Sequence, residues 1–214
     1  MTRSSALVAT RSAGKLRELR PLFEARGVSL IDLKDAGIPE TSAEDELEVF
    51  DTFEENALAK ARYFHRVSGR ATFADDSGLA VVALDGGPGV RSKRWSGRAD
   101  LSGQALDGEN NRLLLERLRG VENRRAQYVC AAAFVDWDRE VVRVGEVQGW
   151  IREAPSGENG FGYDPYFWSE ELGITFGEAT REMKERVSHR ARAFRALLDA
   201  LGDQGIVTPS AARS

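Results

Sequence analysis

Apolar runs of strand length alternate with helical patterns in the first part of the chain. Residues 5–10 form an apolar run suited to a buried strand, and apolar side chains recur at helical spacing over residues 14–26. Gly27 is placed to end this helix, and residues 28–33 predict a second strand. Pro21 predicts a kink or a late start of the helix, because proline lacks a backbone donor.

The next helix and strand lead to an acidic pair. Residues 52–55, Thr-Phe-Glu-Glu, form a capping-box pattern, which predicts a helix that Gly69 ends. Residues 70–74 indicate a strand, and we expect Asp75 and Asp76 at its end, where the strand passes into a loop. Adjacent strand residues point to opposite faces, so the two carboxylates are expected to have different roles.

The second half of the chain carries both helical and β patterns. A leucine stripe predicts a helix over residues 107–119. Two β-rich runs, residues 127–135 and 140–151, are joined by a polar turn and predict a long hairpin. A glycine-rich segment, residues 155–165, precedes a last helix for which Ser188 is the expected N-cap. Together these patterns predict an α/β fold with a central mixed sheet.

Composition narrows the class of protein. A chain of 214 residues with 42% apolar and 30% charged residues can bury a core, and we expect a single domain over residues 1–202 with a frayed tail at 203–214. The net charge of −4 argues against a nucleic-acid-binding protein. The single cysteine, Cys130, excludes an intrachain disulfide. No apolar run approaches the roughly 18 residues of a membrane helix, so we expect a cytoplasmic protein without a membrane partner.

A candidate phosphate loop lies at residues 10–15, Thr-Arg-Ser-Ala-Gly-Lys, between the first strand and the first helix. Unpaired N–H groups and the helix dipole attract an anion there, and Thr10, Ser12 and Lys15 add two hydroxyls and a positive charge. The loop is not a Walker A motif, because it lacks the first glycine and the hydroxyl residue after the lysine. A capped helix with a solvated lysine is the alternative.

Carboxylates offer a candidate metal site. One residue of the pair at 75–76 could hold a divalent cation that neutralises phosphate charge, although a polar turn is the alternative. An acidic cluster at residues 44–48 could supply a second ligand or could be a solvated surface. Asn56 and Lys60, four residues apart on one helix, could both reach phosphate oxygens, with a surface pair as the alternative.

The last third offers a candidate binding site for a planar ligand. Residues 157–165, Gly-Glu-Asn-Gly-Phe-Gly-Tyr-Asp-Pro, combine a flexible backbone with two aromatic rings and a carboxylate, which suits stacking on a base. Lys184, His189 and Arg190 are expected at the start of the last helix, where an uncharged imidazole and a guanidinium could donate hydrogen bonds to a carbonyl oxygen. A helix cap with a salt-bridged arginine is the alternative.

The order of these motifs resembles the inosine triphosphate pyrophosphatase family. The matching stretches span residues 7 to 193 and read LVATRSAGKLREL, TFEENALAKA, ADDSGLAV, ALDGGPGVRSKRWSG, GENGFGYDPYF and EMKERVSHRARA. The resemblance implies an ITPase-like α/β fold with two lobes and a substrate cleft between them, and a homodimer. It implies hydrolysis of deaminated purine triphosphates (dITP, ITP and XTP) to the monophosphate and pyrophosphate, with Mg²⁺ as cofactor.

The resemblance also implies roles for matching residues. Asp76 corresponds to the general base and Mg²⁺ ligand, and Glu48, with Glu44 as the runner-up, to the second metal-linked carboxylate. Mg²⁺ would bridge the phosphates while Asp76 deprotonates the attacking water. The other substrate-binding positions are Thr10, Arg11, Ser12, Ala13, Gly14 and Lys15 in the phosphate loop, Ser77, then Phe161, Gly162, Tyr163 and Asp164 in the base-stacking loop, and Lys184, His189 and Arg190 in the base-reading group.

Two positions and two alternative functions remain open. Ser12 stands where the family usually has asparagine, which leaves one phosphate contact in question, and Lys93 is a further candidate phosphate ligand. The chain could instead be a pyrophosphatase for another modified nucleotide, such as a pyrimidine triphosphate. It could also be a nucleotide-binding regulator without catalytic activity, which would bind dITP and release no pyrophosphate.

Overall fold

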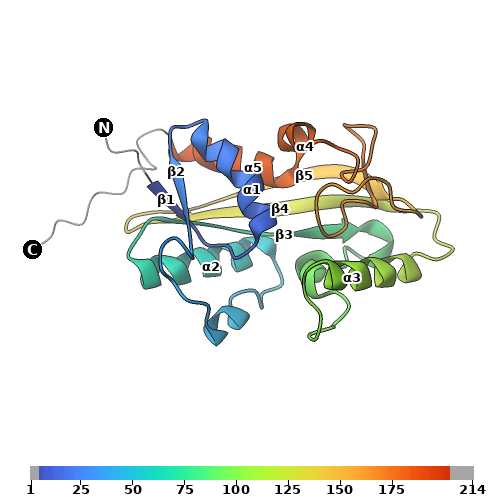
Figure 1. Ribbon diagram of the computed structural model, residues 1–214, viewed down its shortest axis with the longest axis horizontal. Helices are drawn as coiled ribbons and strands as arrows, with labels where there is room; N and C mark the ends of the chain where they lie inside the picture. Colours follow the sequence, from blue (N-terminus) through green and yellow to red (C-terminus); the bar gives the residue numbers. More distant parts are fainter. Residues whose placement is uncertain (1–4, 203–214) are drawn as a thin grey trace, which may run out of the picture. The chain divides into compact units, whose positions relative to one another are not determined.

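The strands form one mixed sheet in the computed structural model, which describes residues 5–202 (Figure 1). They are β1 (Ser5–Val8), β2 (Ser29–Asp32), β3 (Thr72–Val81), β4 (Arg125–Val135), β5 (Glu140–Ile151) and β6 (Phe167–Ser169), in the order β2-β1-β3-β4-β5-β6. β1 pairs in parallel with β2 and β3, whereas β5 pairs antiparallel with β6. This confirms the predicted α/β fold with a mixed sheet.

The helices follow the predicted order, with one addition. They are α1 (Ala13–Glu24), α2 (Phe53–Ser68), α3 (Gly103–Arg117), α4 (Arg181–Val187) and α5 (His189–Leu201), with short 3₁₀ helices at Ser42–Glu46, Val82–Leu84 and Gly89–Arg94. None of the helices within residues 5–202 has the length and apolar character needed to cross a membrane. The tail predicted at residues 203–214 lies outside the described part of the chain.

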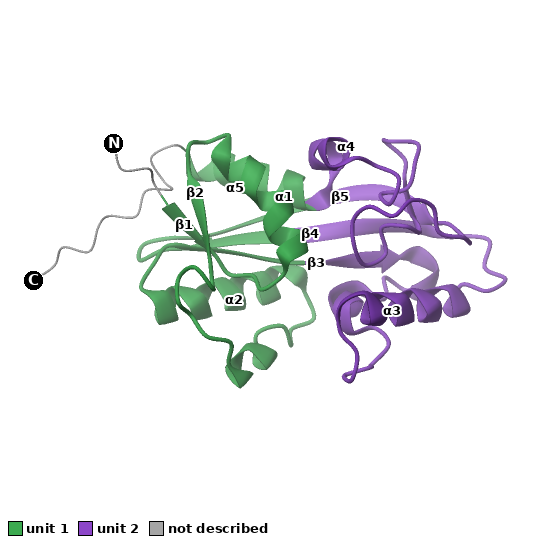
Figure 2. Ribbon diagram, in the orientation of Figure 1, with its two compact units in different colours: residues 1–76, 131–145, 190–214 green, residues 77–130, 146–189 purple. Residues whose placement is uncertain are grey.

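The chain divides into two compact units, which Figure 2 colours separately. Unit 1 consists of Met1–Asp76, Ala131–Gly145 and Arg190–Ser214, and unit 2 consists of Ser77–Cys130 and Glu146–His189. The boundaries fall within β3, β4 and β5, so each of these strands contributes residues to both units.

Helices cover both faces of the strands in unit 1, with α1 and α5 on one face and α2 on the other (Figure 1). Phe73 of β3 contacts Phe23 of α1 and Phe194 of α5, at ring-centroid distances of 4.9 and 6.5 Å. The next residue, Ala74, lies in a separate buried cluster with Phe64 of α2. The alternation of strand side chains therefore directs the odd-numbered residues of β3 in unit 1 toward α1 and α5, and the even-numbered ones toward α2.

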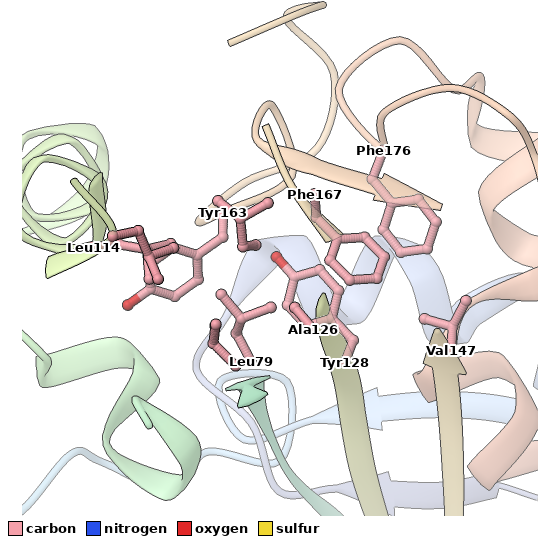
Figure 3. Close-up of a cluster of buried hydrophobic side chains, with 11 residues drawn as sticks. Leu79, Leu114, Ala126, Tyr128, Val147, Tyr163, Phe167 and Phe176 are labelled. Carbon is pink, nitrogen blue, oxygen red and sulfur yellow. The ribbon is translucent and has the colours of Figure 1, made fainter. Parts of the chain in front are cut away.

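Unit 2 has an aromatic core of its own. Leu79 of β3, Leu114 of α3 and Tyr128 of β4 are buried together with Phe167 of β6 and with Phe176 (Figure 3). The rings of Phe167 and Phe176 lie 4.6 and 5.9 Å from that of Tyr128. This core fixes the elements from which the loops of unit 2 project.

Two predicted boundaries were wrong. The strand expected to end before Asp75 continues to Val81, because Leu79 and Val81 extend the buried pattern into the core of unit 2. α3 begins at Gly103, four residues before the predicted start. α1 begins at Ala13 with Pro21 inside it, so of the two effects predicted for Pro21 the late start does not occur and the kink stays a prediction.

The last helical region is split into two helices. Thr180 caps α4, with its hydroxyl accepting a bond from Met183 N, and the extended conformation of Ser188 (ψ 147°) separates α4 from α5. Lys184 therefore lies in the last turn of α4, and not at the start of the last helix as predicted.

Candidate functional site

The acidic pair lies inside β3, and its two carboxylates have different partners. Asp75 follows the odd-numbered pattern of Phe73 and meets side chains from α1 and α5, whereas Asp76 follows Ala74 and meets a side chain of α2. The expected position at a strand end was wrong. The expectation that the two residues point to opposite faces is confirmed by these contacts.

Asp75 is the centre of a buried cationic network in unit 1. Its Oδ2 atom lies 3.0 Å from Lys15 Nζ and 3.1 Å from Arg190 Nε, and its backbone oxygen accepts a bond of 2.9 Å from Lys60 Nζ. Burial alone would raise the pKa of Asp75, but Lys15, Arg190 and Lys60 hold it far below its usual range. Arg190 also pairs with Glu18. Asp75 is therefore a permanent anion that orders several cations.

Asp76 lies in a different electrostatic environment. Its side chain is buried, and Asn56 Nδ2 of α2 donates a hydrogen bond of 2.9 Å to its Oδ2 atom. Burial, and then the nearby charge of Glu48, raise the pKa of Asp76 to about 6. Ser77 follows Asp76 along β3 and is partly exposed. The carboxyl group therefore binds its proton more tightly than a solvent-exposed aspartate does.

Asn56 and Lys60 are buried, so the alternative of a surface pair was wrong. Their exposed fractions are 0% and 9%. Both lie on the face of α2 that covers the sheet, which places Asn56 against Asp76 and Lys60 against the backbone of Asp75.

The two candidate glutamates have separate surroundings. Glu48 forms an ion pair with Lys60 and contributes to the raised pKa of Asp76. Glu44 instead pairs with Arg11, at 2.7 Å, and accepts a bond from Thr41 N. Residues 5–202 contain no group of three or more His, Cys, Asp or Glu residues that could hold a metal ion. Glu48 is thus the glutamate that acts electrostatically on Asp76.

The candidate phosphate loop precedes α1, as predicted. Ser12 is the N-cap, and its hydroxyl accepts a bond of 3.3 Å from Lys15 N, while Thr10 Oγ1 accepts one of 3.2 Å from Ser12 N. Ala13 and Gly14 form the first turn. The alternative of a solvated lysine was wrong, since the Lys15 side chain is 16% exposed and paired.

Arg11 is directed away from this turn by its contacts. Its guanidinium donates two bonds to Glu44, of 3.1 and 2.7 Å, and one of 3.0 Å to the Ile38 carbonyl. These contacts tie the start of the phosphate loop to the segment that leads to Glu48. The role in substrate binding that the sequence predicted for Arg11 stays a prediction.

The candidate base-stacking loop lies in unit 2 and presents an aromatic ring. Phe161 is 36% exposed, and Lys184 Nζ lies 5.0 Å from its ring centroid. Asp164 accepts bonds from Lys184 Nζ, at 2.6 Å, and from Phe161 N, at 2.8 Å. A side chain at Gly160, where φ is +80°, would place its Cβ 2.0 Å from the Asp164 carboxylate. The loop therefore requires glycine here.

The residues of the predicted base-reading group have contacts in different units. His189 is buried in unit 2 and stacks on Tyr128, with centroids 4.7 Å apart and planes 9° apart. Lys184 is in the same unit, paired with Asp164. Arg190 belongs to unit 1, where it meets Asp75 and Glu18, so its contacts match the salt-bridged arginine of the alternative.

Sequence reasoning missed three polar residues on α3 that contact the loops of unit 2. Asp107 and Asn111 bond to Gly162. Asn110 bonds to the backbone of Ser92, Lys93 and Ser96. The signal was present in the sequence, because two adjacent asparagines interrupt the leucine stripe of this helix. A buried amide in such a position needs a hydrogen-bond partner, which indicates contact with irregular backbone.

Comparison with known proteins gives consistent results along almost the whole chain. A dITP/XTP pyrophosphatase of Mycolicibacterium paratuberculosis is 46% identical over 208 residues, covering 92% of this chain and 96% of the relative. A dITP/XTP pyrophosphatase of Bordetella parapertussis is 42% identical over 204 residues, covering 94% and 92%.

Solved structures and a family profile extend the likeness to the fold. The Ham1 protein of Staphylococcus aureus matches with a TM-score of 0.77 and 33% identity, over 92% of this chain and 97% of that one. The profile of the Ham1 family matches residues 6–200. The chain therefore belongs to the Ham1 family.

Proposed function

We propose that this protein hydrolyses deaminated purine nucleoside triphosphates, such as dITP and XTP, to the monophosphate and pyrophosphate. The observation that carries the proposal is the pair of buried aspartates on β3, of which Asp75 is neutralised by cations while Asp76 has a pKa near 6. The names of the relatives, dITP/XTP pyrophosphatases, support the same activity.

Asp76 is the proposed general base. A base works best when its pKa lies close to the working pH, and burial brings that of Asp76 to about 6. Asn56 donates to one carboxylate oxygen and so fixes the orientation of the group. Asp76 takes the proton of a water molecule, whose oxygen attacks phosphorus and displaces pyrophosphate.

Lys15 and the N-terminus of α1 are the proposed phosphate-binding groups. Burial opposes a charge on Lys15, but the Asp75 carboxylate outweighs it and raises the pKa of the ammonium group. Lys15 therefore stays positive at neutral pH, beside a helix start whose N–H groups favour anions. These charges stabilise the negative charge that develops on the phosphates.

Asp76 and Glu48 are the proposed ligands of Mg²⁺. The donor set fits this ion, which is commonly bound through one or two carboxylates together with substrate phosphates and water. Glu48 contributes to the raised pKa of Asp76, which supports the choice of these two carboxylates as the ligand pair. When bound, Mg²⁺ supplies charge neutralisation at the phosphates. Glu44, held by Arg11, is the less suitable ligand.

Phe161, Lys184 and His189 are the proposed base-binding residues. The exposed ring of Phe161 offers a stacking surface, and Lys184 and the imidazole offer donors for the 6-carbonyl of a deaminated purine. An amine at that position would face donors instead of an acceptor, so adenine nucleotides are rejected.

Release of pyrophosphate from a panel of nucleotides, with and without Mg²⁺, tests the proposal. We expect dITP and XTP to be cleaved faster than dATP by a factor on the order of 10⁴, which a site that bonds a substrate carbonyl can reach. Equal rates on dITP and dATP would contradict the base-reading role. Tight binding of dITP without turnover would instead indicate a regulator.

The homodimer and the cytoplasmic location stay predictions. Light scattering measures the first, where a mass twice that of the 23.6 kDa chain is expected. Fractionation of cells that produce the protein measures the second.

A further inference from the structure

Helix α3 contacts the base-stacking loop through polar side chains. Gly162 N donates a bond of 2.9 Å to Asp107 Oδ2, and Asn111 Nδ2 donates a bond of 2.9 Å to the Gly162 carbonyl. Asp107 and Asn111 are four residues apart, so they share one side of α3, one turn from each other. Both polar groups of the Gly162 backbone thus bond to the same helix.

α3 holds Gly162 through its backbone groups. Gly162 has no side chain to pack, and its φ of +63° is one that glycine adopts readily. Hydrogen bonds to its N–H and C=O groups are therefore the interactions that select one conformation. Asn111 is 8% exposed, and its Oδ1 atom has no hydrogen-bond partner among the described residues, so the bond to Gly162 is what its amide contributes.

The residues on either side of Gly162 are anchored separately. The ring of Tyr163 is buried beside Leu114 of α3 (Figure 3), and its hydroxyl donates a bond of 2.8 Å to the Ser92 carbonyl. Phe161 N is bonded to Asp164, and the Phe161 side chain is exposed. Gly162 therefore links the exposed Phe161 to the buried Tyr163.

We propose that Asp107 and Asn111 form a two-point clamp on Gly162 and are positioning residues for nucleobase binding. The clamp holds the Phe161 ring in its stacking position before the nucleotide arrives, so that less conformational freedom is lost on binding. The proposal deepens the proposed function and rests on it, since it requires that the loop binds the base.

Kinetics of clamp variants test the proposal. Asp107→Ala removes the acceptor and Asn111→Leu removes the donor at similar size; each is expected to raise the KM for dITP on the order of tenfold, with kcat within about twofold. Asp107→Asn keeps an acceptor oxygen and is expected to restore a nearly normal KM. Leu115→Ala, on the same helix and packed against the core, is the matched control for lost stability and should leave KM unchanged.

Hydrogen exchange of the Gly162 amide, measured without nucleotide, provides a second readout. We expect exchange at least about tenfold faster in Asp107→Ala than in wild type or Leu115→Ala. An unchanged exchange rate would overturn the clamp. Faster exchange with an unchanged KM, or a KM that rises equally in Leu115→Ala, would overturn its role in base binding. A wild-type protein that cleaves no dITP would overturn the proposed function itself.

Discussion

The proposed substrate-binding residues of the two units have different chemistry. In unit 1, Asp75 and the cations around it form a buried network in which each charge is compensated. In unit 2, the Asn111 amide and the Asp107 carboxylate hold the loop that carries the exposed Phe161 ring, through hydrogen bonds to the backbone of Gly162. In the proposed function, unit 1 therefore controls protonation and charge, which decide rate, whereas unit 2 controls shape, which decides affinity.

Within unit 1, the neighbouring residues Asp75 and Asp76 differ in the direction of their pKa shifts. Both are buried, yet the pKa of Asp75 is lowered and that of Asp76 is raised, because strand alternation gives them different neighbours. A buried carboxylate beside cations is stable as an anion, and one beside another carboxylate is not. In the proposed mechanism, Asp75 is therefore structural and Asp76 is reactive.

The largest expected effect is the loss of turnover in Asp76→Asn. Removing the general base is expected to lower kcat for dITP by ~10²–10⁴-fold. The amide can still accept the bond from Asn56, so the fold is expected to be kept, as circular dichroism would check. Wild-type turnover in this variant would remove Asp76 from the mechanism.

In metal-free buffer, Asp75→Asn and Asp76→Asn are expected to change the free energy of unfolding in opposite directions. Asp75→Asn leaves buried cations uncompensated and is expected to lower the free energy of unfolding by about 3–5 kcal/mol. Asp76→Asn removes a carboxylate whose folded pKa is raised from 3.8 to about 6, and is expected to stabilise the protein by about 2–3 kcal/mol at pH 7.5.

The pH dependence of stability tests the raised pKa of Asp76. Because its folded pKa is the higher one, the folded state binds more protons between pH 3.8 and about 6, and the cost of the charge fades as the pH falls through this window. The stabilisation of Asp76→Asn should therefore vanish near pH 4. Urea unfolding at pH 4 and 7.5 measures it, and an advantage that persists at pH 4 would contradict this account.

The two glutamates provide the next comparison. Glu48→Gln is expected to raise the Mg²⁺ concentration needed for half-maximal activity roughly 10–100-fold, as loss of a carboxylate ligand weakens binding. Glu44→Gln, which loosens only the contact to Arg11, is the matched control and should change it less than about threefold. The reverse order would make Glu44 the ligand.

The smallest expected effect belongs to the stacking ring. Phe161→Ala is expected to raise the KM for dITP about tenfold with kcat almost unchanged, since a base-stacking contact is worth about 1–3 kcal/mol. Phe161→Tyr keeps the ring and should keep the KM. A fall in kcat with constant KM would mean that Phe161 affects the rate and not the affinity. That result would contradict the proposed difference between the two units.

Local patterns predicted most elements but misplaced the acidic pair. The capping box at Thr52 and the left-handed Gly69 fixed both ends of α2, because caps are set by neighbouring residues. The continuation of β3 past Asp76 depended on the burial of Leu79 and Val81 in a core assembled from distant segments. From the local sequence, two adjacent charged residues predict the end of a strand. In the folded chain the strand continues, because each carboxylate has partners on its own face of the sheet.

The partners of the site residues were decided by tertiary structure. The sequence by itself determined the α/β order of elements, the phosphate loop before α1 and the residue types of the site, because period, caps and motifs are local properties. Only the folded chain decided that Arg190 meets Asp75, that Asn56 and Lys60 are buried, and that α3 bonds Gly162. These contacts join residues far apart in sequence, and a charge or amide acquires its pKa and its partner only from the groups that packing brings beside it.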